Sequence, residues 1–493
     1  MRAAPRALAL AALLAATPGA EAAGAAGAPP LTLSPCQIEH PLRLTVVPAD
    51  CGTLSVPENP AEPLGRRIGL RVARVGAINR RKQADPLFVL AGGPGQAAGE
   101  FYASVAAAFA RIHRDRDILL VDQRGTGGSN RLDCDEDEER LYRASDAEIT
   151  AFTERCLAKL KARANVAYYT TSLAVADLEQ VRAALGFAQL NLYGVSYGTR
   201  VAQHYLRRYP ARVRTVILDG VVPPGLSVGP ALATDAEQAL QRILARCAHE
   251  PACAAAFGDP ARDYETLRAA LKEHAVPVTL TDPAGGQSQQ LDFNEEHLAT
   301  VLRLGGYSAD YAALLPLLLH GAAARADYAP LAAQFLLLKR SLESLAAGMH
   351  NSVLCAEDVP RYAGALLDRA ALADTFMGTS EVDALALICA LWPRGPVDAD
   401  LHAPLHSDVP ALLLSGSDDP VTPPRYAREA ARGFSRALEV VLAGFGHGQL
   451  TAPCMDRVLA EFLRRGTTAG LDTGCTRNAR PMPFFTSVNG PPP

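Results

Sequence analysis

The chain has 493 residues, of which 49% are hydrophobic and 20% are charged. This composition supports a large buried core and excludes a disordered chain. The 48 basic and 52 acidic side chains give a formal net charge of −4, so there is no basic excess for binding a nucleic-acid backbone. We therefore expect a globular protein of one large domain or two ordinary ones that does not bind nucleic acid.

Residues 1–22 have the three parts of a secretory signal peptide. Two arginines lie among the first six residues, an apolar run covers 7–16, and Ala20-Glu21-Ala22 is a small-x-small cleavage site. The apolar run is too short for a membrane span, which needs about 20 residues. The sequence predicts export to the periplasm or the extracellular medium, with no membrane span in the mature chain.

The cysteines agree with export, because their number is even and an oxidising compartment favours disulfides. The Cys-x-x-Cys and His-Glu-x-x-His spacings of metal sites do not occur in the sequence. We therefore expect structural disulfides and neither a metal nor an organic cofactor. Sequential pairing would close five short loops, but the sequence leaves the pairing open. The ten cysteines are Cys36, Cys51, Cys134, Cys156, Cys247, Cys253, Cys355, Cys389, Cys454 and Cys475.

Short apolar runs without alternation are typical of parallel strands that are covered on both faces. Helical patterns at 173–185 and 197–209 lie between some of these runs, and strands that alternate with helices predict a mostly parallel sheet. The runs are 87–90, 118–121, 190–193, 213–218, 411–414 and 438–442.

The alternation of strands and helices stops between 223 and 405, where the pattern is largely helical, for example at 311–345. The sequence predicts one α/β core in two parts that a mainly helical cap interrupts. The predicted segments are the core at 41–222 and 406–475, the cap at 223–405, and an extended Pro-rich tail at 476–493.

The nucleophile candidate lies in Gly194-Val195-Ser196-Tyr197-Gly198, a G-x-S-x-G pattern. An apolar run precedes it and a helical pattern follows it, which is the context of a nucleophile elbow. Small residues on both sides let the strand and the helix approach closely, and the helix N-terminus favours developing negative charge. We predict that Ser196 is the nucleophile.

A serine nucleophile needs a base and an acid that orients the base. His447 is the base candidate, because it follows the last apolar run between flexible glycines, in Gly444-Phe445-Gly446-His447-Gly448. In this class of serine hydrolase the acid lies between the serine and the histidine in the chain. We favour Asp419, with its neighbour Asp418 left open, and we expect Asp219 to brace the turn that opens the insertion.

An acyl-transfer site also needs backbone N–H groups aimed at the oxyanion. One is expected from Tyr197, the residue after the nucleophile. The second is expected from the loop Ala91-Gly92-Gly93-Pro94-Gly95-Gln96, where glycines let the backbone approach a substrate closely.

These motifs, together with Asp122-Gln123-Arg124-Gly125-Thr126-Gly127-Gly128-Ser129 and the loop after Asp419, resemble one family. They are similar to secreted α/β-hydrolase peptidases related to prolyl aminopeptidase and tripeptidyl aminopeptidase, over about residues 51–475. Prolyl aminopeptidases usually carry His before Gly-Gly-Pro-Gly, whereas this chain has Ala91, which weakens a strict proline-iminopeptidase assignment.

The resemblance implies an α/β-hydrolase fold, with a mostly parallel sheet and a helical cap over the pocket. It also implies that Asp122 and Arg124 fix loops beside the site. The site residues that it implies are Ser196, Asp419 and His447 as the catalytic triad, and Gly93 and Tyr197 in the oxyanion hole, with Gly92 as the close alternative.

An aminopeptidase must bind a protonated amine, for which a carboxylate near the acyl pocket is suited. Glu357, followed by Asp358, is the candidate in the cap. The alternative is that these acids cap a helix or form an internal salt bridge. Trp392 is expected either to line the pocket or to pack in the core.

The expected function is that of an exported serine hydrolase that releases N-terminal residues or short peptides. Its partners would be peptide substrates with a free N-terminus. The alternatives are a carboxylesterase or lipase on the same fold, or a non-catalytic binding protein. The number of residues released, a preference for proline and the oligomeric state are left open.

Overall fold

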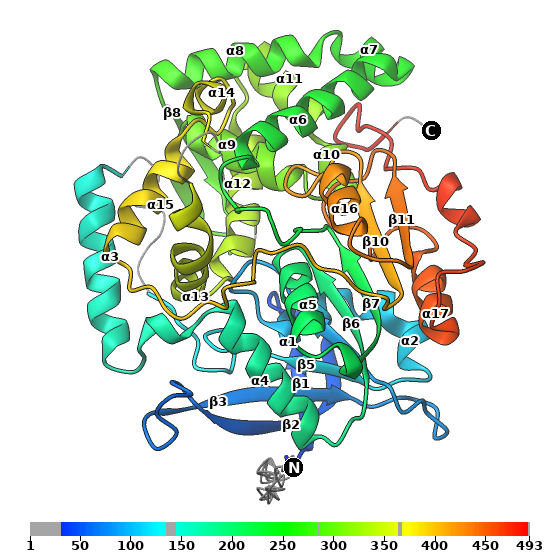
Figure 1. The fold of residues 1–493 in the computed structure, drawn as a ribbon. Helices are drawn as coiled ribbons and strands as arrows, with labels where there is room; N and C mark the ends of the chain where they lie inside the picture. Colours follow the sequence, from blue (N-terminus) through cyan, green and yellow to red (C-terminus); the bar gives the residue numbers. More distant parts are fainter. Residues whose placement is uncertain (1–30, 135–143, 284, 363–366, 492–493) are drawn as a thin grey trace, which may run out of the picture.

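A computed structural model of the chain describes residues 31–134, 144–283, 285–362 and 367–491 (Figure 1). The predicted signal peptide at 1–22 lies outside these residues. The described residues form a nine-stranded sheet in the order β1-β2-β3-β5-β4-β6-β7-β10-β11. The pairs from β1 to β5 are antiparallel and the pairs from β5 to β11 are parallel, so the prediction of a mostly parallel sheet is confirmed.

The six runs predicted as buried strands are all strands of this sheet. Their side chains alternate between two apolar cores, one on each face: Leu192 and Leu218 lie in one core, and Tyr193 and Ile217 in the other. The strands are β1 Ser34–Glu39, β2 Val46–Pro57, β3 Arg67–Val75, β4 Leu87–Leu90, β5 Ile118–Val121, β6 Leu190–Val195, β7 Val213–Asp219, β10 Ala411–Gly416 and β11 Ala437–Leu442.

Helices cover both faces of the sheet, which is why the central strands have no polar face. One core takes side chains from α3 Asp146–Lys161, α4 Thr171–Ala184, α5 Tyr197–Arg208 and α16 Pro424–Ala431. The opposite core takes them from α1 Ala98–Val105, α2 Ala110–His113 and α17 Met455–Arg465.

Residues 223–405, which we call the cap, connect β7 to β10 and lie at the top and left of Figure 1. The boundaries of the cap stay predictions. Its first part runs through α6 Leu232–His249, α7 Pro251–Phe257, α8 Pro260–Glu273, β8 Val276–Thr281, β9 Ser288–Phe293 and α9 Glu295–Gly305. Its second part runs through α10 Ala309–Ala312, α11 Leu315–Arg325, α12 Ala329–Glu343, α13 Ala347–Val353, the π-helical turn η5 Leu354–Asp358, η6 Val359–Arg361, α14 Arg369–Ala373 and α15 Ser380–Leu391.

Two features of the cap differ from the sequence expectation. The antiparallel hairpin of β8 and β9 was not predicted. The helical pattern at 311–345 is also not continuous, because the chain turns between α11 and α12 at Ala326, whose φ of 53° is left-handed.

The expected disulfides are confirmed. Neighbouring cysteines pair in sequence order, as 36–51, 134–156, 247–253, 355–389 and 454–475.

After η8 Gly474–Asn478 the tail returns to the cap, where Phe484 is buried beside the 247–253 disulfide. The guanidinium carbon of Arg246 lies 4.4 Å from the ring centroid of Phe484. No helix in the described ranges is long and apolar enough to cross a membrane.

Candidate active site

Ser196 occupies the turn between β6 and α5, with φ 56° and ψ −127°. A Cβ on Gly194 would lie 2.4 Å from the carbonyl oxygen of Gly198, and a Cβ on Gly198 would lie 2.2 Å from that of Leu90. Real Cβ contacts are never this short, so the turn requires glycine at both positions. The G-x-S-x-G pattern therefore follows from the geometry that presents the serine at the end of the strand.

His447 lies in the loop after β11, beside the turn that carries Asp419. Its Nδ1 atom is 2.9 Å from Oδ2 of Asp419, whose side chain is fully buried after β10. The other oxygen of Asp419 accepts the backbone N–H groups of Val421 and Thr422, each at 2.8 Å. These contacts hold the carboxylate where it orients the imidazole as a general base.

The charges of this pair stabilise each other against the cost of burial. Burial alone would raise the pKa of Asp419, but the charge and hydrogen bond of His447 and the backbone donors hold it below its ordinary value. Burial alone would lower the pKa of His447, but the charge and hydrogen bond of Asp419, and then the charge of Asp219, raise it above its ordinary value. The arrangement therefore favours the imidazolium that forms when the nucleophile loses its proton.

Thr422 is a third member of this cluster and was not predicted from the sequence. The hydroxyl of Thr422 donates to Oδ2 of Asp419 at 2.8 Å, and its oxygen lies 3.0 Å from Nδ1 of His447. A hydroxyl residue three positions after the acid was the available signal, because such spacing is typical of local turn hydrogen bonds. The two adjacent acids, Asp418 and Asp419, have different partners. The carboxylate oxygens of Asp418 lie 3.7 Å from Nε of Arg242 and 3.6 Å from Nε of Arg246.

Asp219 does not act as expected. It was expected to brace the turn that opens the insertion, but its carboxylate accepts the backbone N–H of Gln449, in the loop of His447, at 2.8 and 2.9 Å. Its backbone carbonyl accepts the N–H of Ser196 at 2.9 Å. The sequence could not show this contact, because the loop that it holds lies far along the chain.

The glycine-rich loop after β4 lies against the nucleophile turn. A Cβ on Gly92 would be 3.1 Å from Cβ of Ser196. The N–H of Gly92 donates to Oε1 of Gln96 at 3.1 Å. Within the described part of the chain, the N–H groups of Gly93 and Tyr197 have no protein acceptor. These two groups are therefore the better pair for the predicted oxyanion hole, and Gly92 is occupied.

Comparison with known proteins agrees with this fold. Residues 85–250 match the family described as alpha/beta hydrolase fold, and residues 374–475 match the family described as TAP-like protein. The protein has the α/β-hydrolase fold. Its TAP-like segment contains both Asp419 and His447.

Relatives of this hydrolase are named for different activities. The serine protease Hip1 of Mycobacterium tuberculosis is 25% identical, over 90% of this chain and 91% of that protein. The tripeptidyl aminopeptidase of Streptomyces lividans is 32% identical, over 36% of each chain. The carboxylesterase B of Mycobacterium tuberculosis is 28% identical, over 87% of this chain and 86% of that protein.

Asp122 and Arg124 of the hydrolase each hold neighbouring segments of the chain by hydrogen bonds. The carboxylate of Asp122 accepts the backbone N–H groups of Gly99, at 3.1 Å, and Gly128, at 2.9 Å. Arg124 is fully buried and donates two hydrogen bonds to Asp177, at 2.7 and 2.8 Å. Because Gly99 is in α1, directly after the glycine-rich loop, Asp122 fixes the position of that loop.

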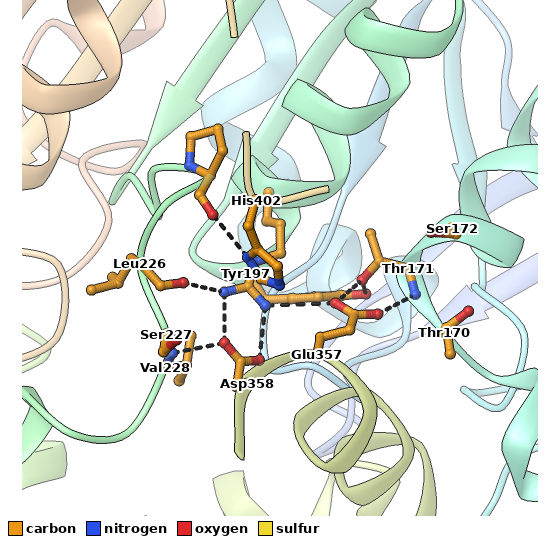
Figure 2. A network of polar contacts seen from close by, with 12 residues as sticks. Thr170, Thr171, Ser172, Tyr197, Leu226, Ser227, Val228, Glu357, Asp358 and His402 are labelled. Atoms are coloured by element: carbon orange, nitrogen blue, oxygen red, sulfur yellow. Dashed lines mark hydrogen bonds and ion pairs between the residues drawn. The ribbon is translucent and has the colours of Figure 1, made fainter. Parts of the chain in front are cut away.

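Glu357 and Asp358 both have internal partners in the buried network of Figure 2. Glu357 accepts the N–H and the hydroxyl of Thr171, at 2.7 and 2.8 Å, and so caps α4. Asp358 accepts two hydrogen bonds from Arg200 of α5, at 2.8 and 2.9 Å. The network joins η5 of the cap to two core helices. The predicted role of Glu357 and Asp358 in binding an amine stays a prediction.

Trp392 packs in the core rather than lining a pocket. It is buried, and its indole N–H donates to the hydroxyl of Ser352 at 3.0 Å. Within the described ranges, no three histidine, cysteine or carboxylate side chains are grouped to hold a metal ion.

A cavity of 810 Å³ lies between α3, which is outside the cap, and α8, α9, α12 and α15 of the cap. Arg303 of α9 and Glu381 of α15 line it and form an ion pair at 3.0 Å. Just beyond the end of α9, the carbonyl of Tyr307 accepts the N–H of His447 at 2.7 Å. The chain that follows α9 therefore contacts His447, and the charge of Arg303 acts to lower the pKa of that histidine.

Proposed function

We propose that the protein is an exported serine peptidase that releases single residues or short peptides from the free N-termini of peptide substrates. The observation that carries the proposal is the contact of His447 with Asp419, at 2.9 Å, in a fold that presents Ser196 on a strained turn. The relatives named serine protease and tripeptidyl aminopeptidase support a peptide substrate rather than another acyl compound.

In the proposed reaction, the hydroxyl oxygen of Ser196 attacks the scissile carbonyl carbon while Nε2 of His447 takes its proton. The N–H groups of Gly93 and Tyr197 stabilise the oxyanion of the tetrahedral intermediate. The imidazolium then protonates the leaving amine, and water hydrolyses the acyl-enzyme with His447 again acting as base. Apart from the substrate and this water, each step uses only side chains and backbone groups of this chain.

Export is proposed from the predicted signal peptide together with the five disulfides. Disulfides persist in oxidising compartments and are rare in the cytosol. Secretion of the full chain from a bacterial host, with N-terminal sequencing of the product, tests this part. A mature N-terminus that follows Ala22 supports export, and a cytosolic product that retains Met1 would contradict it.

A free N-terminus needs a carboxylate to receive the ammonium group. Of the predicted pair in the cap, Asp358 is already paired with Arg200, which leaves Glu357 and one further candidate, Glu381. Glu357 was predicted from the sequence, but it is fully buried and already accepts two hydrogen bonds from Thr171. Glu381 lines the cap cavity, and its side chain is 31% exposed. Comparing E357Q with E381Q on free-amine and acetylated substrates distinguishes the two, because only the amine-binding residue should affect the preference for the free amine.

The test of the whole proposal is a panel of chromogenic anilides on purified mature enzyme. Pro-, Ala- and Ala-Ala-Phe-anilides are each assayed with a free and with an acetylated N-terminus, alongside a short-chain ester. Cleavage of the free-amine anilides alone supports an aminopeptidase, and the best substrate length gives the number of residues released. S196A should lose this activity while keeping its fold.

A carboxylesterase is the second candidate, because a relative that aligns with 87% of the chain is named carboxylesterase B. The catalytic groups act on esters and amides alike, so the pocket decides between them. Hydrolysis of the ester with no turnover of any anilide would favour this candidate over the peptidase.

A further inference from the structure

Asp219 ends the strand β7, which lies between the strand of the nucleophile and the strand of the catalytic acid. In the sheet register it pairs with Val195 of β6 on one side and with Leu414 of β10 on the other. Its backbone carbonyl accepts the N–H of Ser196 at 2.9 Å. The backbone of Asp219 therefore fixes the nucleophile turn directly.

The side chain of Asp219 is fully buried and holds a different catalytic loop. Its two oxygens accept the N–H of Gln449 at 2.8 and 2.9 Å, and Oδ2 also accepts the hydroxyl of Tyr193 at 2.9 Å. Gln449 in turn closes the loop around His447, because its side-chain amide donates to the carbonyl of Gly446 at 2.8 Å. One residue thus connects the nucleophile turn to the loop of the base.

The charge of this carboxylate has no permanent counterion. Among the described residues, no arginine or lysine lies within salt-bridge distance of Asp219. The next residue, Gly220, shows how near the imidazole is, because a Cβ there would be 2.9 Å from Cε1 of His447. A buried carboxylate without a cation is costly, and the imidazolium that forms during turnover is the cation that would compensate for it.

We propose that Asp219 is a positioning residue of the catalytic centre, which holds the His447 loop against the nucleophile turn and supplies a second negative charge beside the imidazolium. The role rests on the proposed function, because it presupposes that His447 is the general base. It is distinct from the role of Asp419, since Asp219 makes no hydrogen bond to the imidazole and acts through Gln449 and through its charge.

Several charged and titratable groups surround His447, and the test must separate them. Asp419, Asp219 and Arg303 act on it through their charges, and the ring of Tyr307 lies 5.0 Å from its own ring. Burial raises the pKa of Asp219 to about 6, so its carboxylate is charged at the neutral pH where the base must work. Removing this charge should lower the pKa of His447.

The decisive variant is D219N, assayed on the best substrate of the anilide panel. We expect kcat to fall about tenfold or more, by analogy with the loss seen when a hydrogen-bonding partner of a metal ligand is removed, with KM little changed. The apparent pKa of the acid limb of kcat/KM should move to lower pH. The matched control is D117N, because Asp117 is also buried but directly precedes β5, at the end of the parallel strands opposite to that of Asp219, where it pairs with Lys82.

A folded D219N enzyme with wild-type kcat and an unmoved acid limb would overturn the proposal, and so would an equal pH shift in D117N. If D219N does not fold, Y193F is used instead, because it keeps the carboxylate of Asp219 and removes one donor that orients it. A wild-type kcat in Y193F would then overturn the proposal. S196A is measured in parallel. Full activity in S196A would contradict the proposed function. Loss of activity in S196A, with kcat and the acid limb unchanged in D219N, would contradict only the proposed role of Asp219.

Discussion

Nδ1 of His447 lies 2.9 Å from Oδ2 of Asp419, while the carboxylate of the adjacent Asp418 faces Arg242 and Arg246 of α6. The turn after β10 thus sends two neighbouring acids in different directions. Only Asp419 is placed to keep the imidazole in the tautomer that a general base needs.

This difference predicts opposite results for two conservative variants. D419N should lower kcat by about 10⁴-fold, the loss seen when a triad aspartate becomes asparagine and the tautomer is wrong. D418N should stay within a few-fold of wild type, because its partners are the cap arginines. Steady-state kinetics on one free-amine anilide, with circular dichroism to verify folding, checks both. Comparable losses in the two variants would contradict the assignment of the acid.

The pH dependence of the reaction follows from the raised pKa of His447. Burial opposes the charged imidazole, but Asp419 and then Asp219 outweigh it, so the folded-state pKa lies above the ordinary value of about 6.5. The base must be neutral to accept the serine proton. The acid limb of kcat/KM should therefore lie above the pKa of a free histidine, and activity should rise with pH through it.

A pH profile between about 5 and 9 measures this limb. The sign of the shift gives an internal check, because removing the Asp419 charge must lower the pKa of His447. The residual activity of D419N should consequently show its acid limb at lower pH than wild type. If the acid limb of kcat/KM has the same apparent pKa in D419N as in wild type, a group other than His447 controls that limb.

The close approach of Gly198 to Leu90 predicts a sharp steric limit at the nucleophile turn. G198A places a methyl group 2.2 Å from a backbone carbonyl, which no rotamer can relieve, so α5 or β4 must move. We expect a loss of about 1–3 kcal/mol of stability, as for other overpacked sites, and a marked drop in kcat because Ser196 shifts with the helix. Thermal unfolding and kinetics measure the two effects.

Gly76 is the matched control for this substitution. A Cβ built on it meets nothing within 4 Å, and the residue follows β3. G76A should leave both the unfolding temperature and kcat close to wild type. If G198A behaved like G76A, the turn would be more adaptable than the contact with Leu90 indicates.

The sequence predicted the core better than the cap, for a physical reason. The central strands are covered on both faces, so their apolar runs are unambiguous. In the cap, the strand β9 reads Ser-Gln-Gln-Leu-Asp-Phe with only Leu291 and Phe293 buried, which is too polar to identify as a strand. The break between α11 and α12 had one signal, Pro330, which lies in the first turn of α12, where a proline is tolerated. The left-handed residue itself, Ala326, gave no signal, because alanine is a good helix former and is rarely left-handed.

The candidate site shows the same limit. Ser196 and His447 lie in local motifs, and local motifs can be recognised from the sequence. The choice between Asp418 and Asp419 depends on the direction of a turn, and the contact of Asp219 with Gln449 depends on two loops that meet only in the folded chain. Helix capping and a salt bridge were among the roles predicted for Glu357 and Asp358, but the sequence did not identify Thr171 and Arg200 as their partners.

Glu357 leads to a prediction about stability rather than catalysis. Burial, opposed by the charge of Arg200 and then reinforced by that of Asp358, raises its pKa to about 7 from an ordinary 4.5. Between these two values the folded state holds a proton that the unfolded state releases. Stability therefore decreases as pH rises through this interval, because the folded state binds more protons than the unfolded one.

E357Q removes this titration, because glutamine stays neutral and can still accept from Thr171. We expect the unfolding temperature of E357Q, relative to wild type, to increase as the pH is raised from about 4.5 to about 7. Thermal unfolding at a series of pH values measures the difference, with the exposed Glu62 of the β2–β3 loop changed in E62Q as the control. Parallel curves for E357Q and wild type would show that Glu357 is already ionised in the folded protein, held by Arg200 at 3.6 Å.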